Sequence, residues 1–250
     1  MCCFSRPVES VSATSIFARS GADGRQFVAY SMTLRAPEDL AMVLPLPVKP
    51  GSGEKSVEFI DLKNYADFFK ELKKGFPEPT PALASRSLGA PMSAKLEVIN
   101  VGNFQASFVP TVADFSRLDE RFRLPAGTWD KLPTYRDHGF AVFKLKSGDA
   151  KVHPMAFSFP RAKPTELFFP TVHIHDGEVH ERADFDHVLY CQRGPADQFT
   201  LLDWDESIRP VGLYMQMPKA KGILDAGEHC YRHVLLGTLP NKDTVLKSDA

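Results

Sequence analysis

Hydrophobic and polar residues alternate along much of this chain, and pairs of alternating runs flank short turn segments. The clearest pair is Ile16–Arg19 with Gln26–Met32, on either side of Ser20–Gly24. Two further pairs are Leu96–Val101 with Phe104–Val109, and Phe140–Lys146 with Lys151–Phe159. Alternation places apolar side chains on one face of a strand, and turn residues between two runs favour a hairpin. The pattern predicts a mainly β (α+β) protein with antiparallel, sandwich-like sheets.

Two segments have helical rather than alternating periodicity. Asn64 is expected to cap a helix that runs to Lys74, and Thr111 is expected to cap a second one. Each has an apolar stripe at helical spacing: Tyr65, Phe68, Phe69 and Leu72 in the first, and Val112, Phe115, Leu118 and Phe122 in the second. We interpret both as helices that pack on a sheet.

The proline pattern bears on domain organisation and on sheet edges. We predict a single domain over residues 1–250. The alternative division is an N-terminal β unit with a helix at 1–76, a linker at 77–94 and a main β unit at 95–250, because 77–94 holds four prolines and a serine-rich middle. Proline also ends several alternating runs, which marks strand edges that could pair in a homo-oligomer.

Composition excludes several classes of protein. The chain is 43% hydrophobic and 24% charged with a formal net charge of −1, as in an ordinary globular protein. No basic stripe suits nucleic acid, and no apolar run is long enough to span a membrane. Four cysteines, two of them adjacent, do not form a disulfide framework. We therefore predict a soluble, cytoplasmic protein without a nucleic-acid or membrane partner.

Three of the eight histidines, His173, His175 and His180, fall within eight residues around Asp176-Gly177. Asp-Gly between alternating runs is a strong signal for a two-residue hairpin turn. Counting outward from that turn, His175 faces Glu178 and His173 faces His180. Opposed and alternate residues share a face, so all four side chains are predicted to project from the same side.

Such a face has the composition of a transition-metal site. Imidazoles and a carboxylate suit copper, zinc or iron, and the pattern does not distinguish among these metals. We predict a metal-binding protein, and, if it is an enzyme, a metal-dependent oxidoreductase or hydrolase acting on a small molecule. A metal storage or sensing protein is one alternative. A solvated hairpin with a polar outer face is the structural alternative.

Two other groups of residues are secondary candidates. Cys2 and Cys3 could add thiolates to the metal site, and His229 and His233 share a face whether their segment is a helix or a strand. The Met-Cys start, followed by the predicted strand Ser15–Arg19, also resembles the start of N-terminal nucleophile hydrolases. That resemblance implies an alternative function, a cysteine amidohydrolase with Cys2 as nucleophile.

The histidine segment resembles the first metal motif of cupins, in which His-x-His precedes a glutamate by four or five positions. His173 and His175 match the pair, whereas His180 stands where the glutamate is expected. Glu178 and Glu181 lie close to that position, and the flanking glycines of cupins are missing. The resemblance implies a three-histidine variant of the motif.

The first fifty residues also resemble an uncharacterised bacterial family, a domain of unknown function. Its members combine an early cysteine, a strand and then a segment of the form Phe/Leu-Ala-x-Val-Leu-Pro-x-Pro. The matching residues are Cys2 or Cys3, Ile16-Phe17-Ala18 and the stretch Ala36–Val48. This resemblance implies no activity.

Overall fold

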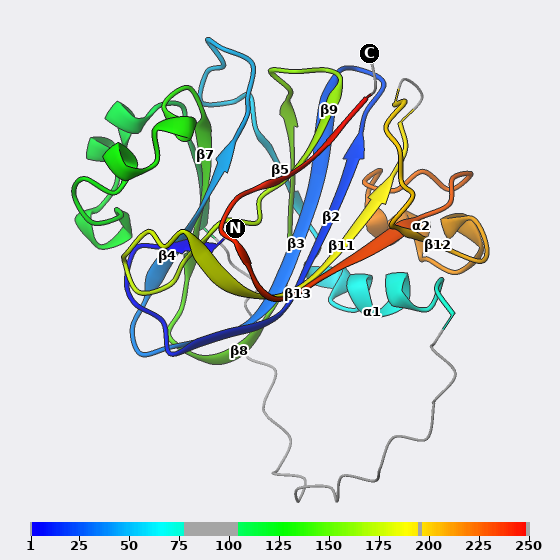
Figure 1. The fold of residues 1–250 in the computed structure, drawn as a ribbon, viewed down its shortest axis with the longest axis horizontal. Coiled ribbons are helices and arrows are strands. Elements are labelled where there is room, and N and C mark those ends of the chain that lie inside the picture. Colours follow the sequence, from blue (N-terminus) through cyan, green and yellow to red (C-terminus); the bar gives the residue numbers. More distant parts are fainter. Residues whose placement is uncertain (1, 78–104, 195–196, 249–250) are drawn as a thin grey trace, which may run out of the picture.

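The computed structural model describes residues 2–77, 105–194 and 197–248, and within them the chain is built mainly from β-strands (Figure 1). Two sheets face each other across a common hydrophobic core, and a short two-stranded sheet completes the β structure. Neighbouring strands are antiparallel except in two pairs, β1 with β10 and β2 with β11. The predicted fold class, mainly β with few helices, is confirmed.

The sheets have five, seven and two strands. The first has the order β10-β1-β4-β7-β6, with bounds β1 Cys2–Phe4, β4 Leu40–Leu46, β6 Gln105–Val109, β7 Gly139–Leu145 and β10 His173–Ile174. The second has the order β12-β13-β11-β2-β3-β8-β5, with bounds β2 Ser10–Ser20, β3 Arg25–Ala36, β5 Glu58–Asp61, β8 Gly148–Pro160, β11 Arg182–Gln192, β12 Asp205–Glu206 and β13 Tyr231–Pro240. The third pairs β9 Glu166–Phe169 with β14 Thr244–Lys247.

The predicted helices are shorter than expected. The first is a 3₁₀ turn, η1 Lys63–Tyr65, followed by α1 Phe68–Lys73. The second consists of two 3₁₀ turns, η2 Val112–Arg117 and η3 Glu120–Phe122, because Leu118 between them is extended. The remaining helical segments are η4 Trp129–Lys131, η5 Pro133–Tyr135, η6 Val211–Leu213 and α2 Met217–Ala220.

The predicted hairpins have different outcomes. The hairpin of Ile16–Arg19 with Gln26–Met32 is confirmed, because β2 and β3 pair antiparallel up to Ser20 opposite Gln26. The hairpin across Ser147 is wrong, because β7 pairs with β4 and β6 while β8 pairs with β3 and β5. The chain therefore crosses from one sheet to the other at that turn. The predicted strand Leu96–Val101 lies outside the described residues.

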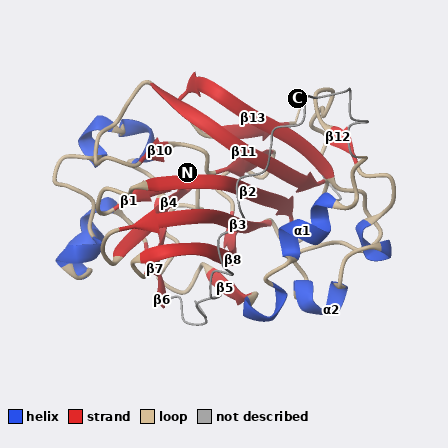
Figure 2. Cartoon of the chain, turned by 90° about the horizontal axis from the view of Figure 1, so that it is seen from below, coloured by secondary structure: helices blue, strands red, loops and turns tan. Residues whose placement is uncertain are grey.

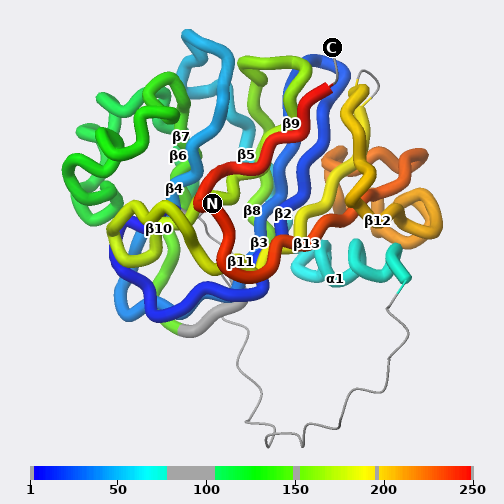
Figure 3. The backbone as a smooth tube through the Cα atoms, viewed as in Figure 1, coloured from blue at the N-terminus to red at the C-terminus, as the bar shows by residue number. Residues whose placement is uncertain are grey.

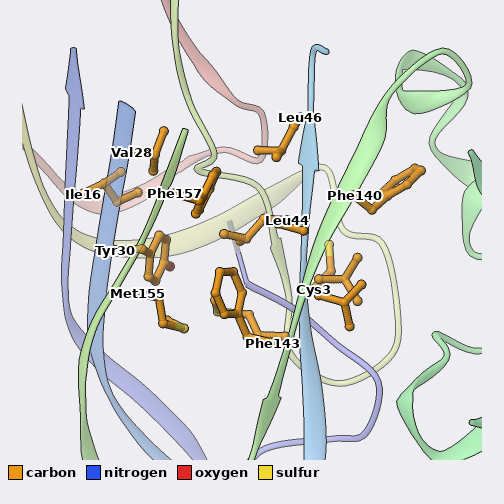
Figure 4. Packing of buried hydrophobic residues seen from close by; sticks show 14 of the residues in the cluster. Cys3, Ile16, Val28, Tyr30, Leu44, Leu46, Phe140, Phe143, Met155 and Phe157 are labelled. Carbon is orange, nitrogen blue, oxygen red and sulfur yellow. The ribbon is translucent and has the colours of Figure 1, made fainter. Parts of the chain in front are cut away.

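Alternation along the strands builds the core between the two large sheets. Val28 and Tyr30 of β3 are fully buried and point toward the five-stranded sheet, where Leu44 of β4 lies opposite (Figure 4). Phe143 of β7 meets Phe157 of β8 with ring centroids 5.9 Å apart, so the sheets contact each other directly. Aromatic rings at this spacing contribute packing energy beyond the area they bury.

A second apolar cluster lies on the other face of the seven-stranded sheet. Phe17 and Ala29 project from the opposite face to the residues next to them in sequence, which face the main core. They are buried here against Phe68 and Leu72 of α1. α1 and α2 lie at this end of the sheet, whereas other helical turns lie at the opposite end of the molecule (Figure 2). The packing role that we predicted for the first helical segment is therefore confirmed.

Strands from before and after the undescribed stretch 78–104 are direct neighbours in both large sheets. In the five-stranded sheet β1 and β4 pair with β10 and β7, and in the seven-stranded sheet β2, β3 and β5 pair with β11 and β8. Figure 3 shows the blue β2 beside the yellow β11. Both large sheets therefore contain hydrogen-bonded strand pairs that join the two parts of the chain.

Candidate functional site

The predicted histidine hairpin does not form. β10 contains only His173 and Ile174, and it pairs in parallel with β1, which places Cys2 opposite His173. The next strand, β11, begins at Arg182 and pairs with β13 and β2 instead. Asp176 and Gly177 do turn the chain, since the Asp176 carboxylate accepts a hydrogen bond from the Glu178 amide and Gly177 has a φ of 87°. The turn is not a hairpin, so His180 does not face His173.

His173 instead contacts His187, which was not among the predicted site residues. The two Nε2 atoms lie 3.0 Å apart, and the side chains are almost completely buried, at 7% and 2% exposure. At this distance one imidazole donates a hydrogen bond and the other accepts it. The contact therefore requires that the accepting ring is neutral, and two neutral rings satisfy it when their tautomers are complementary.

Ring stacking extends the pair into a cluster. His175 stacks on His173 with centroids 4.8 Å apart and planes 16° apart, and Phe185 of β11 stacks on His173 at 4.4 Å. The ring of Phe4 in β1 lies 5.6 Å from that of His175. The cluster thus joins β1, β10 and β11 at one end of the sandwich.

Asp186 provides the nearest charge. Its Oδ1 lies 3.6 Å from Nδ1 of His187, which is too long for a direct hydrogen bond but close enough for electrostatic attraction. Its Oδ2 accepts a hydrogen bond from the Ala13 amide at 2.6 Å. Ala13 has a φ of 53° in a bulge of β2, so a strained backbone position presents this amide to the carboxylate. The imidazole of His187 lowers the pKa of Asp186, which keeps the carboxylate ionised.

Burial keeps the imidazoles neutral. It lowers the pKa of His173 to about 2 and that of His175 to about 4, and it also lowers the pKa of His187. Burial acts in this direction because the charged imidazolium loses more solvation than the neutral ring. At neutral pH the three rings are therefore uncharged.

A cavity of about 190 Å³ adjoins the cluster, and its walls include His173, His175 and His187. Three buried polar atoms in this wall have no protein hydrogen-bond partner: Oγ1 of Thr14, Nε2 of His175 and Nδ1 of His187. The cavity is smaller than the usual range for drug-sized ligands, about 300–1,000 Å³. Asp184 and Asp186 also line it, so the cavity is a small polar site that combines neutral imidazoles with carboxylates.

The other predicted site residues lie elsewhere or point to solvent. Glu178 and His180 are exposed, and Nε2 of His180 contacts the Asp176 carboxylate at 2.8 Å, which raises the pKa of His180. His229 hydrogen-bonds the Ser207 carbonyl at 2.7 Å. His233 hydrogen-bonds the Asp203 carbonyl at 3.0 Å.

The two N-terminal cysteines are strand residues of β1. Cys3 is fully buried in the main core opposite Val43 of β4, and the side chain of Cys2 is not described. The structure thus brings only His173 and His175 of the predicted metal ligands together, with the backbone of Cys2 beside them.

Comparisons with known proteins give a structural likeness but no sequence family. No protein-family model matches the chain, and no curated protein matches it. The crystal structure of baculovirus P35 is similar, with a TM-score of 0.50 and 12% identity over 96% of this chain and 97% of P35. The structure of a mutated baculovirus P35 after caspase cleavage has a TM-score of 0.50 and 11% identity, and the match covers 95% of this chain and 100% of that P35 chain. P35 in the caspase-8 complex has a TM-score of 0.46 and 11% identity, and the match covers 95% of this chain and 96% of that P35 chain.

These findings correct the predicted function. The chain shares its overall architecture with P35, and the described residues hold no group of three His, Cys, Asp or Glu side chains arranged to bind a metal. The predicted transition-metal protein with copper, zinc or iron is therefore wrong, as are the alternatives of metal storage and of an amidohydrolase using Cys2. The physical cause of the error is the turn at Asp176-Gly177, which separates His180 and Glu178 from His173 and His175.

Two remaining observations concern partners. No helix in the described part of the chain is both long and apolar enough to cross a membrane. P35 itself forms a complex with caspase-8, a protein partner, whereas the partner predicted for this chain is a small molecule or a metal ion.

Proposed function

We propose that this chain binds a peptidase as a substrate-like ligand and inhibits it. The observation that supports this proposal is the correspondence of fold with P35 over nearly the full length of both chains, including a P35 form captured after caspase cleavage. The proposed partner is a protein.

The topology suits a protein that is cut without falling apart. β1 to β5 precede residue 78 and β6 to β14 follow residue 104, yet members of the two groups are hydrogen-bonded neighbours in both large sheets. A break anywhere between 78 and 104 would leave every one of the described strand pairs intact. The two fragments would stay joined by the core in which Phe143 packs against Phe157 and Phe59. Such a protein can remain on the peptidase after cleavage.

The sequence of that stretch limits which peptidases are candidates. Residues 78–104 contain Arg86 and Lys95 but no aspartate. A peptidase that requires aspartate before the cut bond is not expected to cut there. Peptidases that cut after basic or large apolar residues are the first classes to test, and caspases serve as the comparison.

The experiment measures inhibition and cleavage together. The purified chain is titrated against trypsin-like and chymotrypsin-like peptidases and against caspases, with a small fluorogenic substrate as the readout of residual activity. Intact-mass spectrometry identifies the bond that is cut, and size-exclusion chromatography reports whether the fragments remain together. We expect stoichiometric loss of activity of one class, one cut between 78 and 104, and co-elution of both fragments with the peptidase.

Matched variants connect the cut to inhibition. Alanine in place of the residue before the cut bond is expected to abolish inhibition, whereas Arg136→Ala, an exposed position outside the stretch, leaves it unchanged. The proposal is wrong if no class is inhibited. It is also wrong if the chain is digested while the peptidase retains full activity.

A further inference from the structure

The cavity beside the histidine cluster is lined by residues whose hydrogen-bonding capacity the chain itself does not use. Thr14, His175 and His187 each have a buried polar atom without a protein partner. Thr14 is fully buried and His187 is only 2% exposed. A buried polar atom that lacks a partner costs about 1–3 kcal/mol, and native proteins have few of them. Three such atoms around one cavity indicate that a molecule from outside the chain supplies the missing hydrogen bonds.

Two carboxylates determine the charge of this cavity. Asp184 and Asp186 belong to its lining, and no lysine or arginine in the described part of the chain forms an ion pair with either. Asp184 accepts a hydrogen bond from the Thr238 hydroxyl at 2.5 Å, and Asp186 has the neutral His187 beside it. Asp184 is exposed and Asp186 is partly exposed, so a ligand that arrives from solvent meets these carboxylates first. The lining therefore favours a cation.

The rest of the lining is apolar. Val11 and Phe185 belong to it, and both side chains are partly or fully covered by the fold. A volume of about 190 Å³ holds a molecule of only a few non-hydrogen atoms. Apolar walls beside a negatively charged, hydrogen-bonding end suit a short alkyl chain that carries a positive charge at its end.

We propose that this cavity binds a primary ammonium group carried on a short alkyl chain. An ammonium group has three N–H donors, and Thr14 Oγ1 and the unprotonated imidazole nitrogens have lone pairs that accept them. His187 accepts at Nδ1 when its Nε2 donates to His173. Charge-assisted hydrogen bonds to Asp184 and Asp186 balance the positive charge.

Two sources carry this chemistry, a free alkylamine and the side chain of a lysine in another protein. Binding is a property of this chain alone, so it is measured without a peptidase and does not depend on the proposed inhibition.

The expected affinity is low. Burial is the main cause of the lowered imidazole pKa values, and the positive charge at the N-terminus lowers them further. The same charge repels an added cation, and so small a ligand buries little apolar area. We therefore expect a dissociation constant of about 1 mM for n-butylammonium.

NMR of the full chain labelled with ¹⁵N-histidine tests the proposal. n-Butylammonium chloride is added up to about 20 mM at neutral pH and constant ionic strength. We expect saturable shifts of the His173, His175 and His187 imidazoles, whereas the exposed His180 keeps its position. Tetramethylammonium has the charge without N–H donors, and n-butanol lacks the charge, so both are expected to bind at least about tenfold more weakly.

Three variants locate the binding. Thr14→Val keeps the shape of the side chain and removes Oγ1, and Asp186→Asn removes a charge at constant size. Each is expected to weaken n-butylammonium binding about tenfold. Asp203→Asn is the matched control, because Asp203 is an exposed aspartate outside the cavity. Thermal unfolding checks that every variant retains the fold.

A second ligand distinguishes the two sources. Nα-acetyl-lysine amide presents only its side-chain ammonium, so saturable shifts with this compound assign the site to a lysine of another protein, and shifts with n-butylammonium alone assign it to a free amine. The proposal is overturned if neither compound gives saturable shifts of the three imidazoles. Binding of tetramethylammonium as tight as that of n-butylammonium overturns it too, as does equal weakening by Asp203→Asn.

Discussion

The buried histidine cluster makes the stability of the fold sensitive to acid, and His175 allows a direct test. Burial lowers the pKa of His175 to about 4, compared with 6.5 for a free side chain. Below pH 6.5 the unfolded chain takes up a proton at this position, while the folded chain does not until about pH 4. Stability is therefore lost as the pH falls from 6.5 towards 4.

The magnitude follows from the two pKa values. Each pH unit within this window corresponds to about 1.4 kcal/mol, so His175 alone lowers the free energy of unfolding by about 2 kcal/mol between pH 6.5 and pH 5. His173 and His187 add losses of the same sign, because burial lowers their pKa values too.

His175→Phe is expected to remove the contribution of His175. Phenylalanine keeps a ring between His173 and Phe4, and it replaces a buried Nε2 that has no protein partner. The free energy of unfolding should therefore be unchanged or higher at pH 7, and it should exceed that of wild type by about 2 kcal/mol more at pH 5 than at pH 7.

Urea denaturation at a series of pH values measures this difference. Fluorescence of Trp129 and Trp204 reports unfolding, because their rings pack against Phe140 at 4.5 Å and Phe169 at 5.7 Å. His180→Gln is the control, since His180 is exposed and its pKa is raised rather than lowered. Equal pH slopes for wild type and His175→Phe between pH 7 and 5 would refute the reasoning.

Three further predictions concern buried polar and aromatic contacts. Asp243→Ala removes a carboxylate that accepts hydrogen bonds from Tyr135 and two backbone amides, and should cost about 3 kcal/mol in urea denaturation; a loss below 1 kcal/mol contradicts this. Gln26→Leu breaks both hydrogen bonds to the backbone of Phe168 and should cost about 2–3 kcal/mol, whereas an unchanged melting temperature argues against it. Phe157→Ala should cost about 3–5 kcal/mol by opening a cavity in the core, and a change confined to the unfolding m-value would show that this explanation is wrong.

Local patterns predicted the strands better than they predicted the partners of those strands. Ile16 pairs with Tyr30 as expected, because a short loop allows two alternating runs to pair with their neighbours. The same kind of signal at Ser147 failed, because β7 pairs with β4 in one sheet while β8 pairs with β3 in the other. Alternation specifies which face of a strand is buried, but not which sheet the strand joins.

In the candidate site, too, the local sequence pattern identifies residues but does not specify which residues they contact. His173 and His175 were identified from their spacing, yet the decisive contact is with His187, fourteen positions further along the chain. The cue in the sequence is that Phe185 and His187 alternate with the charged residues Asp184 and Asp186. That cue indicates a buried histidine, but only the tertiary fold places it against His173.

Parallel pairing of β1 with β10 and of β2 with β11 delays assembly of the protein during its synthesis. Cys2 cannot pair until its partner His173 has been synthesised, and Ile16 cannot pair with β11 until Leu189 has been synthesised. Ribosomes add only about 5–20 residues each second. The first strands are therefore exposed for roughly 10–30 s before their partners emerge. During that interval β2 and β3 can form their hairpin, but its apolar side chains have no opposing sheet to cover them. Production of this chain should therefore depend on chaperones that hold the N-terminal hairpin until the C-terminal half emerges.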